Sequence, residues 1–338
     1  MAPSETSPVR RAPNATANGD TSAPIMVRLS GLLWAVVIAV ALGLCGAWVW
    51  LFAAADRAAL PTTDPVAARI ALPPHTSRTD PVVIAGSGSN IPVTRLLARA
   101  HCASRAGQEP TPGEACEVLV AESIGSAGGV SAAADGTIDV GLISRPLKGP
   151  EEALGLTVLP YAQAEVVLAV NAAVPKTEPV DLARFARILR GDDRQWSNGE
   201  RIAPLMREQG DSTHLIASAL SPAFKQANQE ALRRGAVRVL YSDRDMCDAL
   251  RTTPGAVGLT DRGLAVTEAL PVTLFPLDPG ASQEGRPQKV LAFVLKRGEP
   301  GRGAERPAVR AFLDFVKSAE AHAILTAHGY APIPRTTP

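Results

Sequence analysis

Short β-rich runs alternate with segments of helical period from Pro81 almost to the end of the chain. The expected strands cover 81–86, 116–123, 138–144, 156–161 and 165–171. The expected helices cover 91–103, 179–191, 213–235, 242–253 and 307–329. Apolar residues follow a helical period in the second set, whereas the first set consists of short apolar runs bounded by turn residues. This alternation predicts an α/β architecture, built either as a single sheet or as two lobes.

The composition allows a substantial core but provides no overall electrostatic field. Of the 338 residues, 46% are hydrophobic, which is enough for one large domain or two. The 34 basic and 33 acidic residues leave a formal net charge of +1. We therefore expect no nucleic-acid partner, and any anion site must be created locally.

An uncharged segment of 27 residues, Leu29–Ala55, lies near the N-terminus. As a helix it would exceed the roughly 30 Å hydrocarbon core of a bilayer, which predicts one tilted transmembrane helix. The small residues AAAD at 53–56 would suit signal-peptide cleavage, but the apolar core of a signal peptide usually has only about 7–15 residues. We expect an uncleaved signal anchor, with a cleaved signal peptide as the alternative.

The flanks of this segment predict its orientation in the inner membrane. Residues 1–28 are rich in small and polar residues and are expected to form a disordered cytoplasmic N-terminus. Basic residues are slightly more frequent before the segment than after it, which favours a cytoplasmic N-terminus. Residues 56–80 contain four prolines and are expected to be a linker that holds a periplasmic domain of residues 81–335 off the membrane.

The first of three glycine- and serine-rich turns is GSGSNIP, which begins at Gly86. It follows an expected strand, and Pro92 stands where a helix would begin, a position at which its missing N–H costs nothing. The amides of Ser89, Asn90 and Ile91 would then be unpaired at a helix N-terminus. Ordinary turn formation is the alternative, because one glycine-rich turn is a weak signal for a ligand.

The second turn, IGSAGGV at 124–130, lacks bulky side chains. Gly125, Gly128 and Gly129 would leave the backbone accessible, and Ser126 supplies a hydroxyl. The helix expected after this turn would direct the positive end of its dipole at an anion. Tight packing of that helix on a strand is the alternative reason for the glycines.

The third turn, REQGDST at 207–213, places a cation beside polar residues at a helix N-terminus. Capping alone would explain Asp211, Ser212 and Thr213. Arg207 adds a guanidinium that can hold an oxyanion by two hydrogen bonds, unless it is only a surface charge. Three converging helix termini at up to about 2 kcal/mol each, with charge-assisted hydrogen bonds of about 1.5–3 kcal/mol, would suffice for the roughly 8 kcal/mol of micromolar binding.

Taken in order, these motifs resemble those of the phosphate-binding proteins of bacterial ABC importers, which are type II periplasmic binding proteins. The family motifs Gly-Ala-Gly-Ala-Thr-Phe-Pro, Ile-Gly-Ser-Ser-Gly-Gly and Arg-x-Asp-Gly-Ser-Gly-Thr are similar to GSGSNIP, IGSAGG and REQGDST here. Further similar segments are IDVGLISRPL at 138–147, PGAVGLT at 254–260 and GYAPIP at 329–334. The resemblance covers about residues 82–334.

The resemblance implies two α/β lobes joined by a hinge of two crossing strands, with the ligand in the cleft between them. Lobe 1 would comprise 81–160 and 268–335, lobe 2 would comprise 161–267, and the crossings would lie near 162–170 and 270–277. It also implies a binding protein for inorganic phosphate, without catalysis or a cofactor, whose partner is the permease of an ABC transporter.

The expected ligand contacts lie in the three turns and at one strand end. They are Ser89, Asn90, Ile91, Ser126, Ser144, Arg207, Asp211, Ser212 and Thr213. Ser144, followed by Arg145, stands where the family has an aspartate that accepts a hydrogen bond from protonated phosphate, while Asp211 stands where the family has a serine. We expect Asp211 to take over the acceptor role, which would favour hydrogen phosphate over sulfate.

Two other functions are possible on these residues. A sensory or structural domain with a degenerate pocket is the main alternative, because of Ser144. An enzyme acting on phosphate esters would need a nucleophile with a base, or a metal cluster. The five histidines have no metal-like spacing, so we expect no metal, and His214, the one candidate base near the site, is expected to face outward.

The cysteines give one further structural prediction. Cys102 and Cys116 enclose a polar segment of the chain. In an oxidising compartment they would form a disulfide that contributes about 3 kcal/mol, with two unpaired thiols as the alternative. Cys247 lies in an expected helix and is predicted to be buried.

Overall fold

The computed structural model describes residues 81–106, 118–235, 237–278, 280–282, 285–298 and 306–333. The predicted N-terminal region, signal anchor and linker all lie outside these residues, as does Cys116. Within the described ranges, no helix combines the length and the apolar character that crossing a membrane requires.

The strands form one hydrogen-bonded sheet in the order β2-β1-β3-β9-β4-β7-β5-β6, and β8 and β10 also pair with β4. The strands are β1 (Val82–Gly86), β2 (Val118–Ser123), β3 (Val140–Ile143), β4 (Leu156–Asn171), β5 (Ala203–Arg207), β6 (Arg238–Leu240), β7 (Ala256–Asp261), β8 (Val272–Pro276), β9 (Gln288–Lys296) and β10 (Tyr330–Pro332). The neighbours of β1 are parallel to it, as are those of β5, whereas β4 is antiparallel to all of its partners. The α/β architecture is confirmed.

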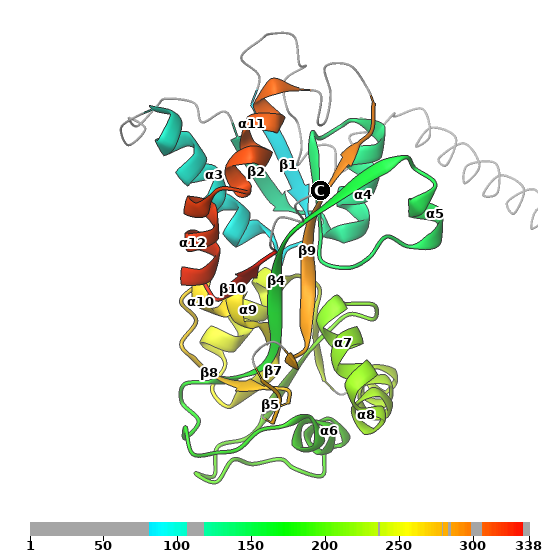
Figure 1. Cartoon of the computed structure of the whole chain (residues 1–338). Coiled ribbons are helices and arrows are strands. Elements are labelled where there is room, and N and C mark those ends of the chain that lie inside the picture. Colours follow the sequence, from blue (N-terminus) through cyan, green and yellow to red (C-terminus); the bar gives the residue numbers. More distant parts are fainter. Residues whose placement is uncertain are drawn as a thin grey trace, which may run out of the picture. The chain divides into compact units, whose positions relative to one another are not determined.

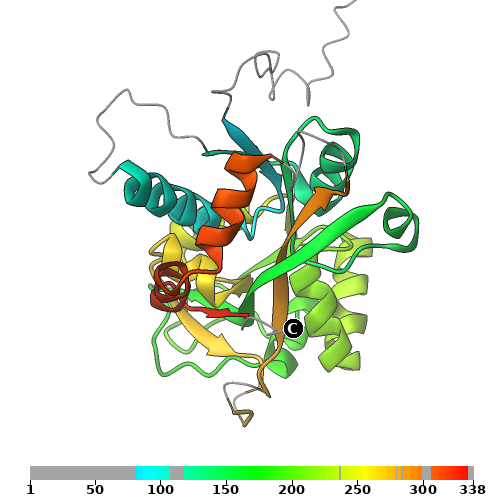
Figure 2. The same ribbon diagram turned by 45° about the horizontal axis from the view of Figure 1, so that its top comes forward.

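Helices cover both faces of this sheet (Figures 1 and 2). They are α3 (Ile91–Ala106), α4 (Gly125–Asp135), α5 (Gly149–Glu152), α6 (Leu182–Arg190), α7 (Ser212–Leu220), α8 (Pro222–Arg234), α9 (Asp243–Thr252), α10 (Arg262–Thr267), α11 (Pro307–Val316) and α12 (Ala319–Ala327). In Figure 2, α3, α11 and α12 lie on one side of the crossing strands β4 and β9, and α4 lies on the other.

Two lobes share the long strand β4 (Figure 1). Its residues Leu156–Glu165 pair with β9, and its residues Val166–Asn171 pair with β7 and β8. Two separate strands were expected here, but residues 162–164 also pair with β9 and β10, so the strand runs on without a break. The first crossing therefore falls within the predicted segment 162–170.

The second crossing differs from the expectation. Residues 268–277 were assigned to lobe 1, yet β8 pairs with the lobe 2 half of β4, and Leu277 packs in a lobe 2 core. The chain returns to lobe 1 only with β9, which pairs with β3 and with the first half of β4.

Two segments predicted as single helices are each broken in two. The segment 213–235 divides into α7 and α8 at Pro222, because proline cannot donate the helical hydrogen bond and Ser221 caps the new helix by accepting from Phe224 N. The segment 307–329 divides into α11 and α12, where the Ser318 side chain caps the second helix by accepting from Ala321 N. A local N-cap thus outweighs continuous helical periodicity at both places.

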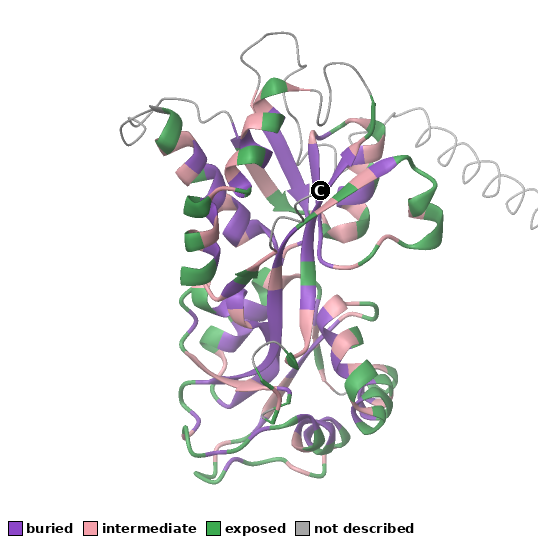
Figure 3. Ribbon diagram, in the orientation of Figure 1, coloured by how far each residue is buried: buried purple, intermediate pink, exposed green. Residues whose placement is uncertain are grey.

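Each lobe has a core on both faces of its sheet, and Figure 3 shows the strands buried between helices with exposed outer faces. In lobe 1, Phe312 and its neighbours pack under α3, α11 and α12, and Val130 and its neighbours pack under α4. In lobe 2, Phe224 lies in the core under α6 and α8, and Leu250 lies in the core under α9 and α10. The covered sheet explains why β1 is an uninterrupted buried run.

The parallel strands of each lobe end at a common edge. In lobe 1, Gly86 of β1 pairs with Ser123 of β2 and with Leu142 of β3. In lobe 2, Arg207 of β5 pairs with Leu240 of β6. The turns that follow these strands therefore lie together, at the carboxyl ends where open α/β sheets bind ligands.

Candidate ligand-binding cleft

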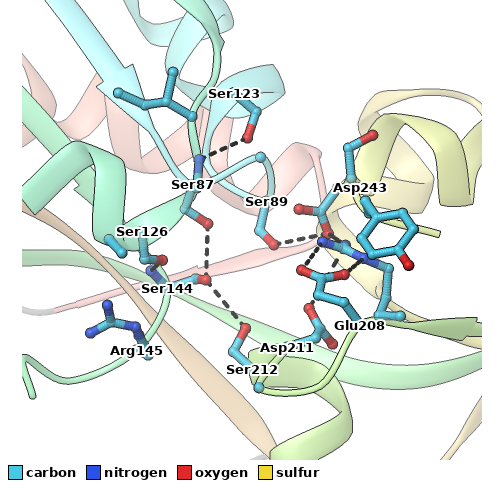
Figure 4. Close-up of a pocket in the computed structure, with 18 of the residues that line it drawn as sticks. Ser87, Ser89, Ser123, Ser126, Ser144, Arg145, Glu208, Asp211, Ser212 and Asp243 are labelled. Atoms are coloured by element: carbon cyan, nitrogen blue, oxygen red, sulfur yellow. Dashed lines mark hydrogen bonds and ion pairs between the residues drawn. The ribbon is translucent and has the colours of Figure 1, made fainter. Parts of the chain in front are cut away.

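A cleft of about 490 Å³ is lined by the turns that follow β1, β2, β3, β5 and β6. Its lining includes Ser89, Ser126, Ser144, Arg207, Asp211 and Ser212, six of the nine residues expected from the sequence. Each of the three predicted turns contributes to the lining, and so does the turn before α9, which was not predicted (Figure 4).

The first turn contributes its serines but not the residues after them. Gly86 has φ +145°, and a Cβ on it would collide with the backbone of Leu142, so the close approach of β1 to β3 requires glycine. The amides of Asn90 and Ile91 donate to the carbonyls of Ser87 and Gly88, so the expectation that these amides are unpaired is wrong. The turn closes on itself here, before the helix begins.

The side chains of Asn90 and Ile91 are buried away from the cleft lining. Asn90 Nδ2 donates to Ile143 O and to Tyr161 Oη, both at 3.2 Å. Ile91 packs in the lobe 1 core. These two residues therefore hold the turn in place beneath the cleft.

The second turn brings the N-terminus of α4 to the cleft. Gly125 has φ +73° and Ser126 lines the cleft. The N-cap residue Ile124 offers no side-chain cap, and Gly125 N donates to Ser123 Oγ at 3.4 Å. A Cβ on Gly129 would lie 2.9 Å from both Gly86 Cα and Leu142 O, so this glycine serves the packing of α4 on β1 and β3. The packing explanation thus holds for Gly129, whereas Gly125 lines the cleft.

The third turn caps α7 with a carboxylate. Asp211 Oδ1 accepts from His214 N at 3.0 Å and lies 3.1 Å from His214 Nδ1. Burial opposes ionisation of Asp211, but His214, Arg207 and Lys289 outweigh burial and hold its pKa well below the usual value. The expectation that His214 faces outward is wrong, because its ring is buried beside Phe224 of α8.

Arg207 is buried among three carboxylates. Its Nε and Nη2 donate to Glu208 at 2.9 and 3.1 Å, and its Nη1 lies 2.9 Å from Asp243 Oδ1 and 3.7 Å from Asp211 Oδ2. Burial disfavours the guanidinium charge, but the carboxylates outweigh it and raise the pKa of Arg207 above its usual value. Arg207 is therefore a permanent cation whose donors the protein's own acids already share.

The cleft as a whole has balanced charge. Three basic side chains line it, those of Arg145, Lys148 and Arg207, and so do three acidic ones, those of Glu208, Asp211 and Asp243. The Arg145 guanidinium also forms a two-bond ion pair with Glu151, with both distances 2.7 Å. An anion would thus interact favourably with the helix N-termini and hydroxyls as soon as it enters the cleft. It would bind a guanidinium only by displacing the carboxylate that is already paired with it.

Serine hydroxyls connect the two lobes across the cleft (Figure 4). Ser87 Oγ donates to Ser144 Oγ at 2.9 Å, and Ser144 Oγ lies 3.2 Å from Ser212 Oγ of lobe 2. Ser144 N donates to Ser126 Oγ at 3.3 Å. The hydroxyls of both lobes are therefore within hydrogen-bonding distance of each other, as in a closed cleft.

A family model described as a PBP superfamily domain matches residues 71–320, well over half of the chain. The chain belongs to the PBP superfamily. No curated protein matches its sequence.

Three solved structures are similar to this chain. A Clostridium perfringens protein, assigned as a phosphate ABC transporter substrate-binding protein and solved with bound phosphate, is 18% identical over 75% of this chain and 100% of its own, with a TM-score of 0.56. An ABC-type phosphate transport receptor from Vibrio cholerae is 19% identical over 75% and 100%, with a TM-score of 0.48. A reduced form of OxyR from N. meningitidis is 13% identical over 75% and 99%, with a TM-score of 0.49. The first of these likenesses shows the two-lobed fold of this PBP superfamily domain.

A lysine that was not predicted from the sequence lies beneath the cleft of this PBP domain. Lys289, on β9, is 2% exposed, and its Nζ donates to Ser89 Oγ of lobe 1 at 2.7 Å and to Thr213 Oγ1 of lobe 2 at 3.2 Å. Thr213 is thus buried below the cleft instead of lining it. Lys289 stands near the start of the apolar run QKVLAFVLK, and a charged residue in a buried strand indicates an ion pair, because lysine is almost never buried unless it is paired.

The fourth turn of the PBP domain, Tyr241–Asp243, was also missed. Ser242 caps α9 by accepting from Asp245 N, and Asp243 Oδ1 accepts from Ser89 Oγ at 3.3 Å across the cleft. Like the third turn, which has Asp211-Ser212, this turn places a serine and an aspartate between a strand and a helix start, and this similarity could have identified it.

The structure describes one of the two cysteines that were predicted to form a disulfide. Cys102 is disulfide-bonded, and Cys116, its predicted partner, lies outside the described residues. Cys247 is buried as predicted and has a free thiol. Among the described residues there is no group of His, Cys, Asp or Glu that could hold a metal ion.

Proposed function

We propose that this chain is an extracytoplasmic solute-binding protein that holds inorganic phosphate, or a similar oxyanion, in the cleft between its lobes. One observation carries the proposal: the N-termini of the three helices α4, α7 and α9, seven serines and the Arg207 guanidinium line the same cleft. The phosphate bound in the C. perfringens protein of similar fold supports it. The ligand would pass to an ABC transporter permease, or its level would be sensed.

We assign direct contacts to the residues that line the cleft. Ser126 and the amides of the first turn of α4, with Ser144 and Ser212, would donate to the anion, because hydroxyls and helix N-terminal amides replace its water shell. Ser89 would be a further direct contact with the anion from lobe 1. Asn90, Ile91 and Thr213 would support the site from below, since their side chains belong to the turn and to the core.

Arg207 would bind the ligand by exchanging partners. Glu208 occupies Nε and Nη2, which are the two donors that an oxyanion would take in a parallel pair. The Glu208 side chain is 34% exposed, so it can swing into water at little cost. The guanidinium, whose Nε also donates to Leu240 O and whose Nη1 stays paired with Asp243, would then form charge-assisted hydrogen bonds with the anion.

Asp211 would select the protonation state of the ligand. Its Oδ1 is used by His214, and its Oδ2 lies 3.7 Å from Arg207. Because Asp211 stays ionised at neutral pH, it can only accept a hydrogen bond, and hydrogen phosphate offers one whereas sulfate does not.

The role would be binding and not catalysis. The Nδ1 of His214, the only base expected near the site, is directed at Asp211 and not into the cleft. The apolar segment 29–55 would tether the domain to the membrane as an uncleaved anchor. A degenerate pocket in a sensory domain would leave the cleft without affinity for any oxyanion.

A thermal-melting series on the full-length protein in detergent tests the proposal. A ligand that binds the folded state at 100 times its Kd stabilises it by about 2.7 kcal/mol, which raises Tm by a few degrees. Phosphate and arsenate should raise Tm, and sulfate should raise it less. No shift with any of them would contradict oxyanion binding and favour the degenerate pocket.

A further inference from the structure

A second hollow, which we call the apolar groove, adjoins the cleft. Its volume is about 470 Å³, close to that of the cleft. Its walls come from both lobes and include Ile143, Val158, Pro160, Leu215, Ile216 and Val290. Strands β3, β4 and β9 of lobe 1 thus face α7 of lobe 2 across an apolar space.

Three residues line both hollows. Ser144 and Arg145 of lobe 1 and Ser212 of lobe 2 belong to the lining of the cleft and of the apolar groove. Ser144 Oγ and Ser212 Oγ lie 3.2 Å apart, so one hydroxyl pair between the lobes stands at the boundary. A small opening of the lobes would separate these hydroxyls and join the polar cleft to the apolar groove.

The apolar groove exposes large hydrophobic side chains to water. Val158 is 37% exposed, Val290 41% and Leu215 54%, although all three lie in regular strands or helices. Covering such surface is favourable, and each buried methylene is worth about fourfold in affinity. Arg145 lines both the groove and the cleft, so the lining changes from cationic and hydroxylated to apolar across the boundary between the two hollows.

We propose that the physiological ligand is an amphiphilic oxyanion, an organic phosphonate or phosphate monoester with a short alkyl or aryl group. This inference rests on the proposed function, because the anionic group would lie in the cleft at Ser126, Ser144 and Ser212. The organic group passes between Ser144 and Ser212 and covers Val158, Val290 and Leu215. Inorganic phosphate occupies only the polar half of this space.

Isothermal titration of the full-length protein in detergent micelles tests the chain-length dependence, with empty micelles as the blank. The probes are inorganic phosphate and methyl-, butyl- and hexylphosphonate. Butylphosphonate should bind at least tenfold more tightly than methylphosphonate, and hexylphosphonate should gain further until the groove is full. Equal affinities along the series, with phosphate still bound, would overturn the inference and leave the proposed function intact.

Matched variants locate the effect. Val290→Ser and Val158→Ser should reduce hexylphosphonate affinity at least tenfold and leave the phosphate Kd unchanged. Val266→Ser is the control, because Val266 is 42% exposed and lines neither hollow. A chain-length gain that survives both groove variants would overturn the inference, as would a groove variant that changes the oligomeric state without changing phosphonate affinity. Absence of binding by every probe would contradict the proposed function itself, and this inference with it.

Discussion

Lys289 Nζ lies 2.9 Å from Asp261 Oδ2, and both side chains are almost wholly buried beneath the cleft. Burial alone would lower the pKa of Lys289, but the charges of Asp261, Asp243 and Asp211 raise it. The ammonium group is therefore charged, and its other contacts reach Ser89 in lobe 1 and Thr213 in lobe 2. One buried cation on a strand of lobe 1 thus contacts a turn of each lobe and holds both in position.

Removing that cation should destabilise the fold. Lys289→Met leaves the Asp261 carboxylate buried without its counter-ion, which typically costs about 3–5 kcal/mol. Urea denaturation followed by circular dichroism measures the change. The double variant Lys289→Met/Asp261→Asn should recover part of the loss, because no uncompensated charge remains. An unchanged free energy of unfolding in the single variant would show that the ion pair does not stabilise the fold.

The Glu208→Gln variant should bind phosphate more tightly than the wild type. The neutral amide competes less strongly for Arg207 and no longer repels the anion. We expect a gain of about tenfold in affinity, or about 1.4 kcal/mol, measured by calorimetric titration. Glu268→Gln, at an exposed position outside the cleft, is the control. Weaker binding in Glu208→Gln would mean that Glu208 helps to hold the ligand and does not compete with it.

Asp211 should make stability depend on pH. Its folded pKa lies below the unfolded value of about 3.9, so its stabilising effect is complete above that value and is lost as pH falls toward the folded pKa. Asp211→Asn keeps a capping side chain but loses the charge. It should cost about 2 kcal/mol at pH 7 and progressively less as pH falls below about 4. A difference that stays constant from pH 7 to pH 3 in denaturation experiments would contradict this role.

Gly129→Ala should distort the contact of α4 with β1 and β3. The new methyl group would meet Gly86 Cα and Leu142 O at 2.9 Å, and such overpacking typically costs about 1–3 kcal/mol. Gly149→Ala is the control, since a Cβ there meets nothing within 4 Å. Melting temperatures of the two variants measure the difference. If both variants melt like the wild type, close packing is not the reason for glycine at 129.

The sequence predicted the α/β architecture and the convergence of the three turns, because both follow from local patterns. Strand periodicity and the serines at the strand ends are visible in the chain itself. In the sequence, Pro222 also indicated a break, but the helical periodicity on either side of it led to the prediction of one continuous helix. The continuity of β4 could not be read locally, since the pairing of residues 162–164 with β9 and β10 sustains it.

The partners of each charge were the least predictable part of the site. Arg207 was expected to be available for a ligand. Its guanidinium instead forms ion pairs with the adjacent Glu208 and with Asp243, 36 positions further along the chain. Lys289 reaches Asp261 and Ser89 only through the crossing of β9 between the lobes. Such pairs depend on tertiary structure, so the composition of the three turns alone overstated how positive the cleft is.

Calorimetric titration of the full-length protein with phosphate, and then with sulfate, measures whether the cleft binds an oxyanion and which one it prefers. We expect a phosphate Kd in the micromolar range or below, and a sulfate Kd at least tenfold higher at neutral pH because Asp211 accepts a proton-borne hydrogen bond. Equal affinities would remove the acceptor role of Asp211 while leaving oxyanion binding in place. No heat of binding with millimolar phosphate would show that the cleft does not bind phosphate.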